Sequence, residues 1–141
     1  MPVNFINADS PFRLKNKRKI KAWILSEIKL QNQVPGDINI IFCSDEYLLE
    51  VNKKYLRHDY YTDIITFPNQ ENENKTGGDL MISVDRIKEN STDFGVAFEE
   101  ELLRVIIHGI LHLLGFGDKT EQEIKSMRNA ENVSLNRFPV E

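Results

Sequence analysis

The chain is poor in cysteine and has no long uninterrupted run of apolar residues. Its one cysteine, Cys43, ends an apolar run and cannot form a disulfide within the chain, so we expect a buried thiol and a reducing compartment, the cytoplasm. The longest apolar region is broken by two histidines and a glycine, which predicts no membrane-spanning helix. The N-terminal residues show no basic start followed by an apolar stretch, so no secretory signal is expected.

Linker-like segments are also missing. The 141 residues contain 7 glycines and 5 prolines, and these do not gather in a stretch that would divide the chain. A composition that is 40% hydrophobic and 28% charged is typical of a soluble globular protein. We therefore expect one domain over residues 1–141.

Positive charge is scarce overall but locally concentrated. The net charge of -4 and the pI near 5.4 argue against a protein that binds nucleic acid over its whole surface. Two interpretations of one basic cluster stay open: a patch that neutralises phosphates, or the solvated face of an amphipathic helix. The cluster consists of Arg13, Lys15, Lys17, Arg18, Lys19 and Lys21.

Hydrophobic periodicity predicts alternating strands and helices. Strands are expected over residues 3–6, 38–42, 64–67 and 80–84, and the unbroken apolar run at 38–42 predicts burial on both faces of that strand. The polar stretch 69–77 predicts a mobile loop joining two antiparallel strands.

Helices are expected over residues 10–31, 44–56, 85–90 and 96–114, and from residue 120 to a point before Pro139. Ser10 and Pro11 predict the start of the first helix, and the capping box from Thr120 to Glu123 predicts the start of the last. The helical stripes expected to face inward are Tyr47, Leu48, Val51 and Tyr55 in the second helix, and Ile124 and Met127 in the last.

The stretch VIIHGILHLLGFGD, residues 105–118, carries the most chemical information. On a helix, His108 and His112 are four residues apart and project from the same face. Their neighbours are apolar nearly all round the helix, which predicts burial, and a buried polar group costs a few kcal/mol unless it is satisfied. A metal ion would satisfy both imidazoles.

Two glycines follow these histidines and predict a reversal of the chain. Gly115 and Gly117 are expected to pivot the backbone and carry Asp118 back toward the imidazoles. Two histidines, one carboxylate and an open position for water are the ligand set of a catalytic zinc site. The alternative is that one histidine is an ordinary core residue and Asp118 caps the next helix, but the paired spacing with the glycine turn favours the metal.

Arg104 lies four residues before His108 and on the same helix face. It is expected either to orient a ligand or bind an anion, or to form a salt bridge with Glu100 or Glu101.

The same stretch resembles the signature of the YbeY family of single-domain metal-dependent endoribonucleases, His-Gly-x-Leu-His-Leu-x-Gly-aromatic-Asp-His. The matching residues are His108, Gly109, Leu111, His112, Leu113, Gly115 and Phe116. Other segments that resemble family motifs contribute Asn52, Tyr55, Asp59, Thr62, Asp63 and Phe67, then Gly78, Asp79, Ile82 and Ser83, and finally Met127 and Glu131.

This resemblance implies an α+β fold with a small, mostly parallel four-stranded mixed sheet, about five helices and a buried, zincin-like metal helix. It implies a single-strand-specific endoribonuclease with one zinc ion at His108, His112 and Asp118. It also implies ribosomal RNA and the small ribosomal subunit as partners, maturation of the small-subunit rRNA 3′ end, and ribosome quality control in the cytoplasm.

The chain departs from the family pattern at two places. Asp118 stands where the family has its third histidine, and Gly117 replaces the preceding Asp; the added negative charge weakens the Lewis acid and makes Mn²⁺ or another divalent ion a second candidate. The family arginine normally follows the motif tyrosine directly, but here Leu56 holds that position. We predict that Arg57 or His58 supplies the phosphate contact instead.

Two other functions stay open at this point. A metallopeptidase would share the histidine spacing, but Gly109 stands where such enzymes place their glutamate base. The other is a non-catalytic ribosome assembly or RNA-binding factor with a structural metal, which the replacement of the third histidine by Asp118 makes more credible.

Overall fold

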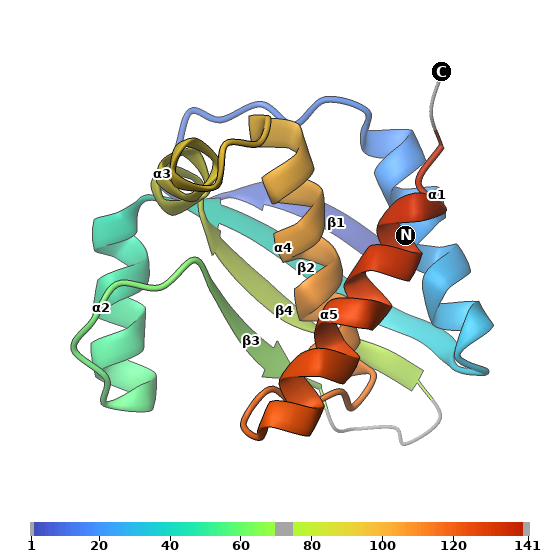
Figure 1. Ribbon diagram of the computed structural model, residues 1–141. Helices are drawn as coiled ribbons and strands as arrows, with labels where there is room; N and C mark the ends of the chain where they lie inside the picture. Colours follow the sequence, from blue (N-terminus) through green and yellow to red (C-terminus); the bar gives the residue numbers. More distant parts are fainter. Residues whose placement is uncertain (1, 70–74, 140–141) are drawn as a thin grey trace.

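Four strands form a single mixed sheet in the part of the chain that the structure, a computed structural model, describes: residues 2–69 and 75–139 (Figure 1). The order across the sheet is β1-β2-β4-β3, in which β1, β2 and β4 are parallel and β3 is antiparallel to β4. This confirms the predicted mostly parallel sheet. The strands are β1 Val3–Asn7, β2 Val34–Cys43, β3 Ile64–Pro68 and β4 Lys75–Ser83.

The helices lie on both faces and at one end of this sheet (Figure 1). Helices α1 and α4 pack on one face, α5 packs against α4, α2 packs on β3 and β4 from the other face, and α3 contacts α4. Within the described residues, none of the helices combines the length and apolarity needed to cross a bilayer. The helices are α1 Lys17–Leu30, α2 Asp45–Leu56, α3 Val84–Phe94, α4 Phe98–Leu113 and α5 Glu121–Asn136.

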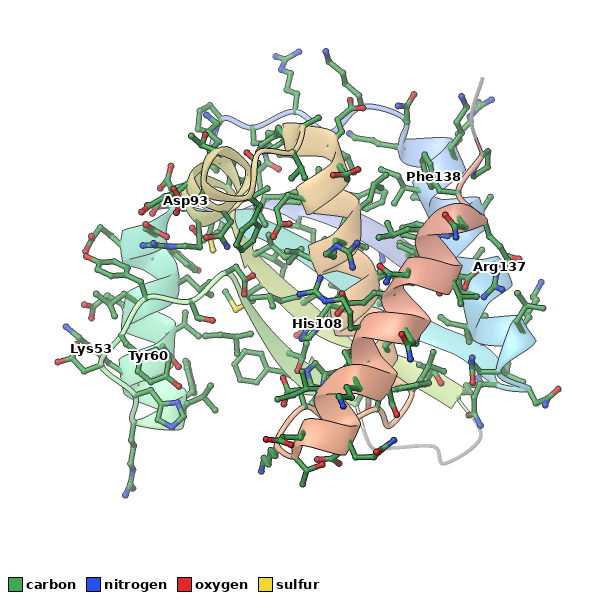
Figure 2. All side chains as sticks on the ribbon, viewed as in Figure 1. Lys53, Tyr60, Asp93, His108, Arg137 and Phe138 are labelled. Atoms are coloured by element: carbon green, nitrogen blue, oxygen red, sulfur yellow. The ribbon has the colours of Figure 1, made fainter. Side chains whose placement is uncertain are left out.

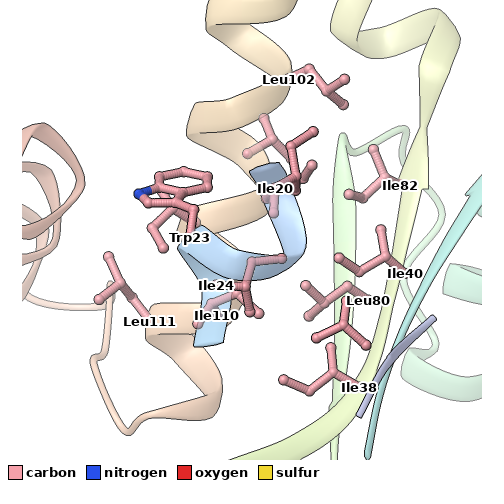
Figure 3. Packing of buried hydrophobic residues seen from close by; sticks show 14 of the residues in the cluster. Ile20, Trp23, Ile24, Ile38, Ile40, Leu80, Ile82, Leu102, Ile110 and Leu111 are labelled. Atoms are coloured by element: carbon pink, nitrogen blue, oxygen red, sulfur yellow. The ribbon is translucent and has the colours of Figure 1, made fainter. Parts of the chain in front are cut away.

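The main core lies between the sheet and helices α1 and α4 (Figure 3). Alternate strand residues such as Ile40 and Ile82 point into it and are fully buried, as the two-residue period of a strand requires. Helix α4 approaches the sheet closely because Gly109 has no side chain: a Cβ there would lie 2.7 Å from Ile64 Cδ1 and 2.9 Å from Leu80 Cδ2. The height of α4 over the sheet is therefore set by this glycine.

A smaller cluster fills the space between the sheet and α2, formed by Cys43, Leu48 and Ile65. Burial raises the pKa of the Cys43 thiol to about 12, which confirms a buried structural thiol. The prediction that residues 38–42 are buried on both faces is wrong for this side of the sheet. Asn39 and Ile41 are only half-buried there, because α2 covers β3 and β4 and leaves β2 partly open.

The first helix begins later than predicted, at Lys17 instead of Ser10. The Asn7 side chain donates to the backbone carbonyls of Ser10 and Phe12, which holds the chain in an irregular conformation. Asn16, with a φ of 61°, then precedes the first helical turn. Tertiary contacts of Phe12 with the core thus override the local helix-start signal of Ser10 and Pro11.

Three other elements are longer than predicted. β2 begins at Val34 and passes through a register irregularity between Pro35 and Ile38, where a proline can be tolerated. β4 begins at Lys75, so the predicted loop 69–77 is shorter on its C-terminal side, and its residues 70–74 lie outside the described part. The short helix predicted at 85–90 is α3, which runs on to Phe94.

Two of the predicted helical stripes are wrong in part. Tyr47 and Tyr55 are exposed, and α2 instead buries Leu48, Leu49 and Asn52. In α5, Met127 is buried as predicted but Ile124 is exposed. The buried face of each helix is therefore turned about the helix axis relative to the stripe that the sequence predicts. The capping box from Thr120 to Glu123 is confirmed.

A buried carboxylate on α1 joins this helix to the C-terminal end of α5. Glu27 is 3% exposed and accepts hydrogen bonds from Ser134 Oγ at 2.6 Å and from Arg137 Nε at 2.9 Å. Burial raises the pKa of Glu27, but the hydrogen bonds from Arg137 and Ser134 outweigh it and hold the pKa below its usual value. The charged form of Glu27 therefore stabilises the contact between α1 and α5.

We predict that Glu27→Gln lowers the free energy of unfolding by about 2 kcal/mol near pH 7, because hydrogen bonds to a charged acceptor are lost. A carboxyl whose pKa is depressed in the folded state contributes stability above its unfolded pKa and loses it as the pH falls. Urea unfolding should therefore show the difference between wild type and variant shrinking below about pH 4.

The matched control is Glu50→Gln, which removes an exposed ion pair with Lys53 (3.7 Å) and should change stability by less than about 0.5 kcal/mol. Equal effects of the two substitutions, or a pH-independent effect of Glu27→Gln, would contradict this account.

Candidate metal centre

Helix α4 places two histidines one above the other at the edge of the core. The Nε2 atoms of His108 and His112 lie 3.1 Å apart, and their side chains are 26% and 23% exposed. The one-turn spacing on the helix accounts for this proximity. Both ring nitrogens are thus directed at one partly open position.

The end of α4 returns the chain toward these histidines. Gly115 has a φ of +105°, its N–H donates to the carbonyl of His112, and the N–H of Phe116 donates to the carbonyl of Leu111. This hydrogen-bond pair is the Schellman motif that ends many helices. A second pivot at Gly117 was predicted, and that prediction is wrong: its φ is not positive, and a Cβ there would collide with the Glu123 carboxylate.

The reversal brings Asp118 to the histidines. Asp118 Oδ2 lies 3.1 Å from Nε2 of His112 and 3.8 Å from Nε2 of His108. Ligand atoms at the Zn–N distance of 2.0–2.1 Å in a tetrahedral site lie about 3.3 Å from one another. The spacing of these three donor atoms therefore fits a zinc-sized ion, and the set is one that could hold a metal.

A carboxylate on α5 fixes the orientation of one ligand. Glu131 Oε2 lies 2.7 Å from Nδ1 of His108. Because an ionised carboxylate only accepts, Nδ1 carries a proton, and in the neutral ring the lone pair of Nε2 then faces His112 and Asp118. Metal-binding histidines commonly donate their second ring N–H to a carboxylate in this way. This contact is evidence for a cation site that is independent of the three-donor spacing.

Glu131 is itself held by Arg104, whose Nη1 lies 2.9 Å from Glu131 Oε1. The predicted salt bridge from Arg104 to Glu100 or Glu101 is therefore wrong. The sequence does not indicate this role of Glu131, because the residue lies 27 positions after Arg104 and no local pattern links the two. Two signals mark the residue itself: its match, with Met127, to a motif of the family that the chain resembles, and its position four residues after the buried Met127 on the same face of α5.

These contacts shift the ionisation of the pair. Burial lowers the pKa of His108, but the carboxylates of Glu131, Asp63 and Asp118 together outweigh burial and raise that pKa. Burial likewise raises the pKa of Glu131, but His108 and Arg104 outweigh it and lower the pKa. Glu131 therefore remains ionised and favours positive charge beside it.

A cleft of about 450 Å³ opens beside the histidines. Acidic side chains outnumber the two arginines in its wall, so the cleft favours a cation and admits a phosphate only when its charge is compensated. Burial raises the pKa of both Asp63 and Glu101 in this wall. The charged and histidine residues that line it are Asp63, Glu100, Glu101, Arg104, His108, Asp118, Arg128 and Glu131.

The structure does not bring Arg57 and His58 to the histidines of α4. Both are exposed at the C-terminal end of α2, and neither is among the described residues that line the cleft. Figure 2 shows their neighbour Tyr60 on the α2 side of the molecule, with His108 on the α4 side. A contact of these two residues with substrate would have to lie outside the cleft.

An α+β fold in which two helical histidines, a carboxylate and a buried supporting glutamate face an acidic cleft defines the class of metal-dependent hydrolases. Comparison with known proteins identifies the family within this class. A family model described as "Endoribonuclease YbeY" matches residues 5–139. The chain belongs to the YbeY endoribonuclease family.

The relatives cover nearly the whole chain. The chain is 46% identical to the "Endoribonuclease YbeY" of Christiangramia forsetii over 99% of this chain and 96% of that protein. It is 51% identical to the protein of the same name from Bacteroides fragilis over 84% and 85% of the two chains. A solution structure of a Thermotoga maritima protein, 26% identical, matches with a TM-score of 0.64 over 95% of this chain and 87% of that one.

We predict that the purified chain contains about one equivalent of a divalent metal, and that a His108→Ala/His112→Ala variant contains none. Elemental analysis after dialysis measures both. His58→Ala is the matched control, since it removes the remaining histidine of the chain, exposed on α2, and should leave the metal content unchanged. Retention of metal by the double variant would place the ion elsewhere.

Proposed function

We propose that this chain is a single-strand-specific, metal-dependent endoribonuclease that processes ribosomal RNA, including the 3′ end of the small-subunit rRNA. We propose further that residues 1–141 act as one domain, and that it works in the cytoplasm and in ribosome quality control. The observation that carries the proposal is the convergence of His108, His112 and Asp118 beside the cleft. The family to which the chain belongs acts as an RNA hydrolase.

His108, His112 and Asp118 are the residues that would hold the metal. Two imidazoles and one carboxylate suit zinc, and the carboxylate also makes Mn²⁺ or another divalent ion acceptable. When bound, such an ion polarises a phosphoryl oxygen of the RNA as a Lewis acid. The acidic wall of the cleft supports its positive charge.

The other residues of the site orient these ligands and handle protons. Glu131 holds the His108 ring by its Nδ1–H, and Arg104 holds Glu131. Asp63 and Glu101 lie in the cleft wall with raised pKa values, so a carboxylate oxygen of one of them is suited to hold the proton released by the attacking water. Asp63 is the better candidate of the two for this proton, because its carboxylate interacts electrostatically with His108.

The phosphate contact is assigned to Arg57 or His58. An RNA strand that enters an acidic cleft needs cations along its path, and Arg57 follows α2 as its C-terminal cap residue, exposed to solvent. A guanidinium matches the two oxygens of a phosphate, which favours Arg57 over His58.

The metallopeptidase alternative loses support from the packing of α4. Peptidases with this histidine spacing need a glutamate where this chain has Gly109. A Cβ there would lie within 3.0 Å of the Ile64 and Leu80 side chains, which would have to move to admit one. Gly109 itself carries no group that could act as such a general base.

We predict that His112→Ala lowers the rate of cleavage of a structured RNA with single-stranded ends by at least about 100-fold, because loss of a supporting residue alone typically costs 10- to 100-fold. Gel analysis of RNA cleavage by both proteins, purified in parallel, measures the difference. Equal cleavage by wild type and variant would assign the activity to a contaminant. Tight RNA binding without cleavage by wild type would favour a non-catalytic assembly factor.

We predict that Arg57→Ala raises KM for RNA about five- to tenfold with little change in kcat, because it removes a phosphate contact outside the cleft. The increase should diminish at high salt, where phosphate contacts are screened. Lys29→Ala, which removes an exposed cation from the end of α1, is the matched control and should leave KM unchanged. If Arg57→Ala and His58→Ala both cleave RNA like wild type, the assignment is wrong.

A further inference from the structure

A short exposed segment on the α2 side of the molecule combines cations with aromatic rings. All residues from 53 to 61 are exposed, and they include three cations, one acid and three tyrosines. The segment is therefore basic in a chain whose net charge is -4. Tyr55 and Tyr60 are 61% and 55% exposed, so this basic segment also presents two large rings to solvent.

Two rings in this segment form a stacked pair. The His58 and Tyr60 rings have centroids 5.1 Å apart and planes 19° from parallel. A hydrogen bond of 2.9 Å between Tyr60 Oη and His58 Nδ1 holds them together. Because His58 covers one face of the Tyr60 ring, the exposure of that ring must come from its edges and its other face.

A buried side chain holds this pair in place. Asn52 is 1% exposed; its side-chain Nδ2 donates to the backbone carbonyl of Tyr60 at 2.9 Å, and its backbone carbonyl accepts from the N–H of His58 at 3.1 Å. The segment is thus tied at two points to α2. The exposed ring is preorganised, which reduces the entropy that a ligand stacking on it would have to remove.

The pair lies close to the cleft along the chain. Asp63, which lines the cleft, follows Tyr60 by three positions, so their Cα atoms are at most about 11 Å apart. Lys54 Nζ lies 5.5 Å above the ring of Tyr55, and Arg57 precedes the stacked pair. Figure 2 shows Tyr60 and Lys53 together on this side of the molecule.

We propose that Tyr60, stacked on His58, is a platform for a base of single-stranded RNA whose backbone continues into the cleft. Neighbouring cations, Arg57 and Lys54, contact the phosphates. This proposal rests on the proposed ribonuclease function. The cleft itself is acidic, so most of the affinity for a polyanion has to arise outside it, and aromatic stacking with adjacent cations supplies that affinity without sequence preference.

A protein partner is the competing occupant, because tyrosine and arginine are also frequent at protein interfaces. The near-parallel ring pair, the excess of cations and the short connection to the cleft favour RNA. Stacking of a base needs a ring face that is open and fixed, and both conditions are met at Tyr60.

The test is the affinity of the metal-containing protein for a labelled oligouridine of about ten nucleotides, measured by fluorescence anisotropy and with the probe checked for integrity afterwards. Tyr60→Ala should weaken binding on the order of tenfold, since loss of one stacked base typically weakens binding at least fivefold. Tyr60→Phe keeps the ring and should bind within about twofold of wild type. An abasic oligomer of the same length should bind wild type and Tyr60→Ala equally.

Tyr47→Ala is the matched control, since it removes an exposed tyrosine at the other end of α2. Equal binding of oligouridine by wild type and Tyr60→Ala would overturn the platform, and so would an equal loss of binding to the abasic oligomer. Binding through Tyr60 by a protein that cleaves no RNA would refute the ribonuclease function and leave the platform standing. Cleavage of RNA by wild type, with no effect of Tyr60→Ala on binding, would support the ribonuclease function and refute the platform.

Discussion

The hydrogen bond between His108 and Glu131 is the contact on which the metal centre depends. It joins α4 to α5, selects the ring nitrogen that faces Asp118 and gives the buried Glu131 carboxylate a partner. A buried carboxylate without such partners would be costly, and Arg104 supplies the second. The same contact therefore stabilises the packing of two helices and orients a histidine that could hold a metal, so the candidate site depends directly on the packing of the fold.

Because the cleft is acidic, it suits the binding of a cation better than the binding of RNA phosphates. Carboxylates around the histidines suit a divalent cation, but they oppose the approach of a polyanionic substrate. Further cations lie outside the cleft, at the end of α2 and in the cluster at residues 13–21; Arg13 and Lys15 of that cluster precede α1, so the predicted helix face does not account for them. In the function proposed above, substrate affinity and metal chemistry therefore come from different parts of the surface.

The sequence alone predicted what depends on neighbouring residues. The spacing of His108 and His112, the turn at Gly115 and the capping box at Thr120 all follow from local rules, and the structure contains each of them. The start of α1 could not be predicted, because Asn7 and the core contacts of Phe12 compete with the local signal. The exposed Tyr55 was assigned to a buried stripe, because periodicity does not specify which side of α2 the sheet contacts.

Local sequence therefore determined the elements, their caps and the two histidines that face one way. Only the tertiary structure decided that Glu131 supports His108, that Arg104 pairs with Glu131, and that Arg57 lies outside the cleft. The physical reason is the separation along the sequence of the residues that interact. Helix periods and turns involve residues a few positions apart, whereas the partner of a buried charge is chosen by how α4 and α5 pack, and that packing depends on the whole core.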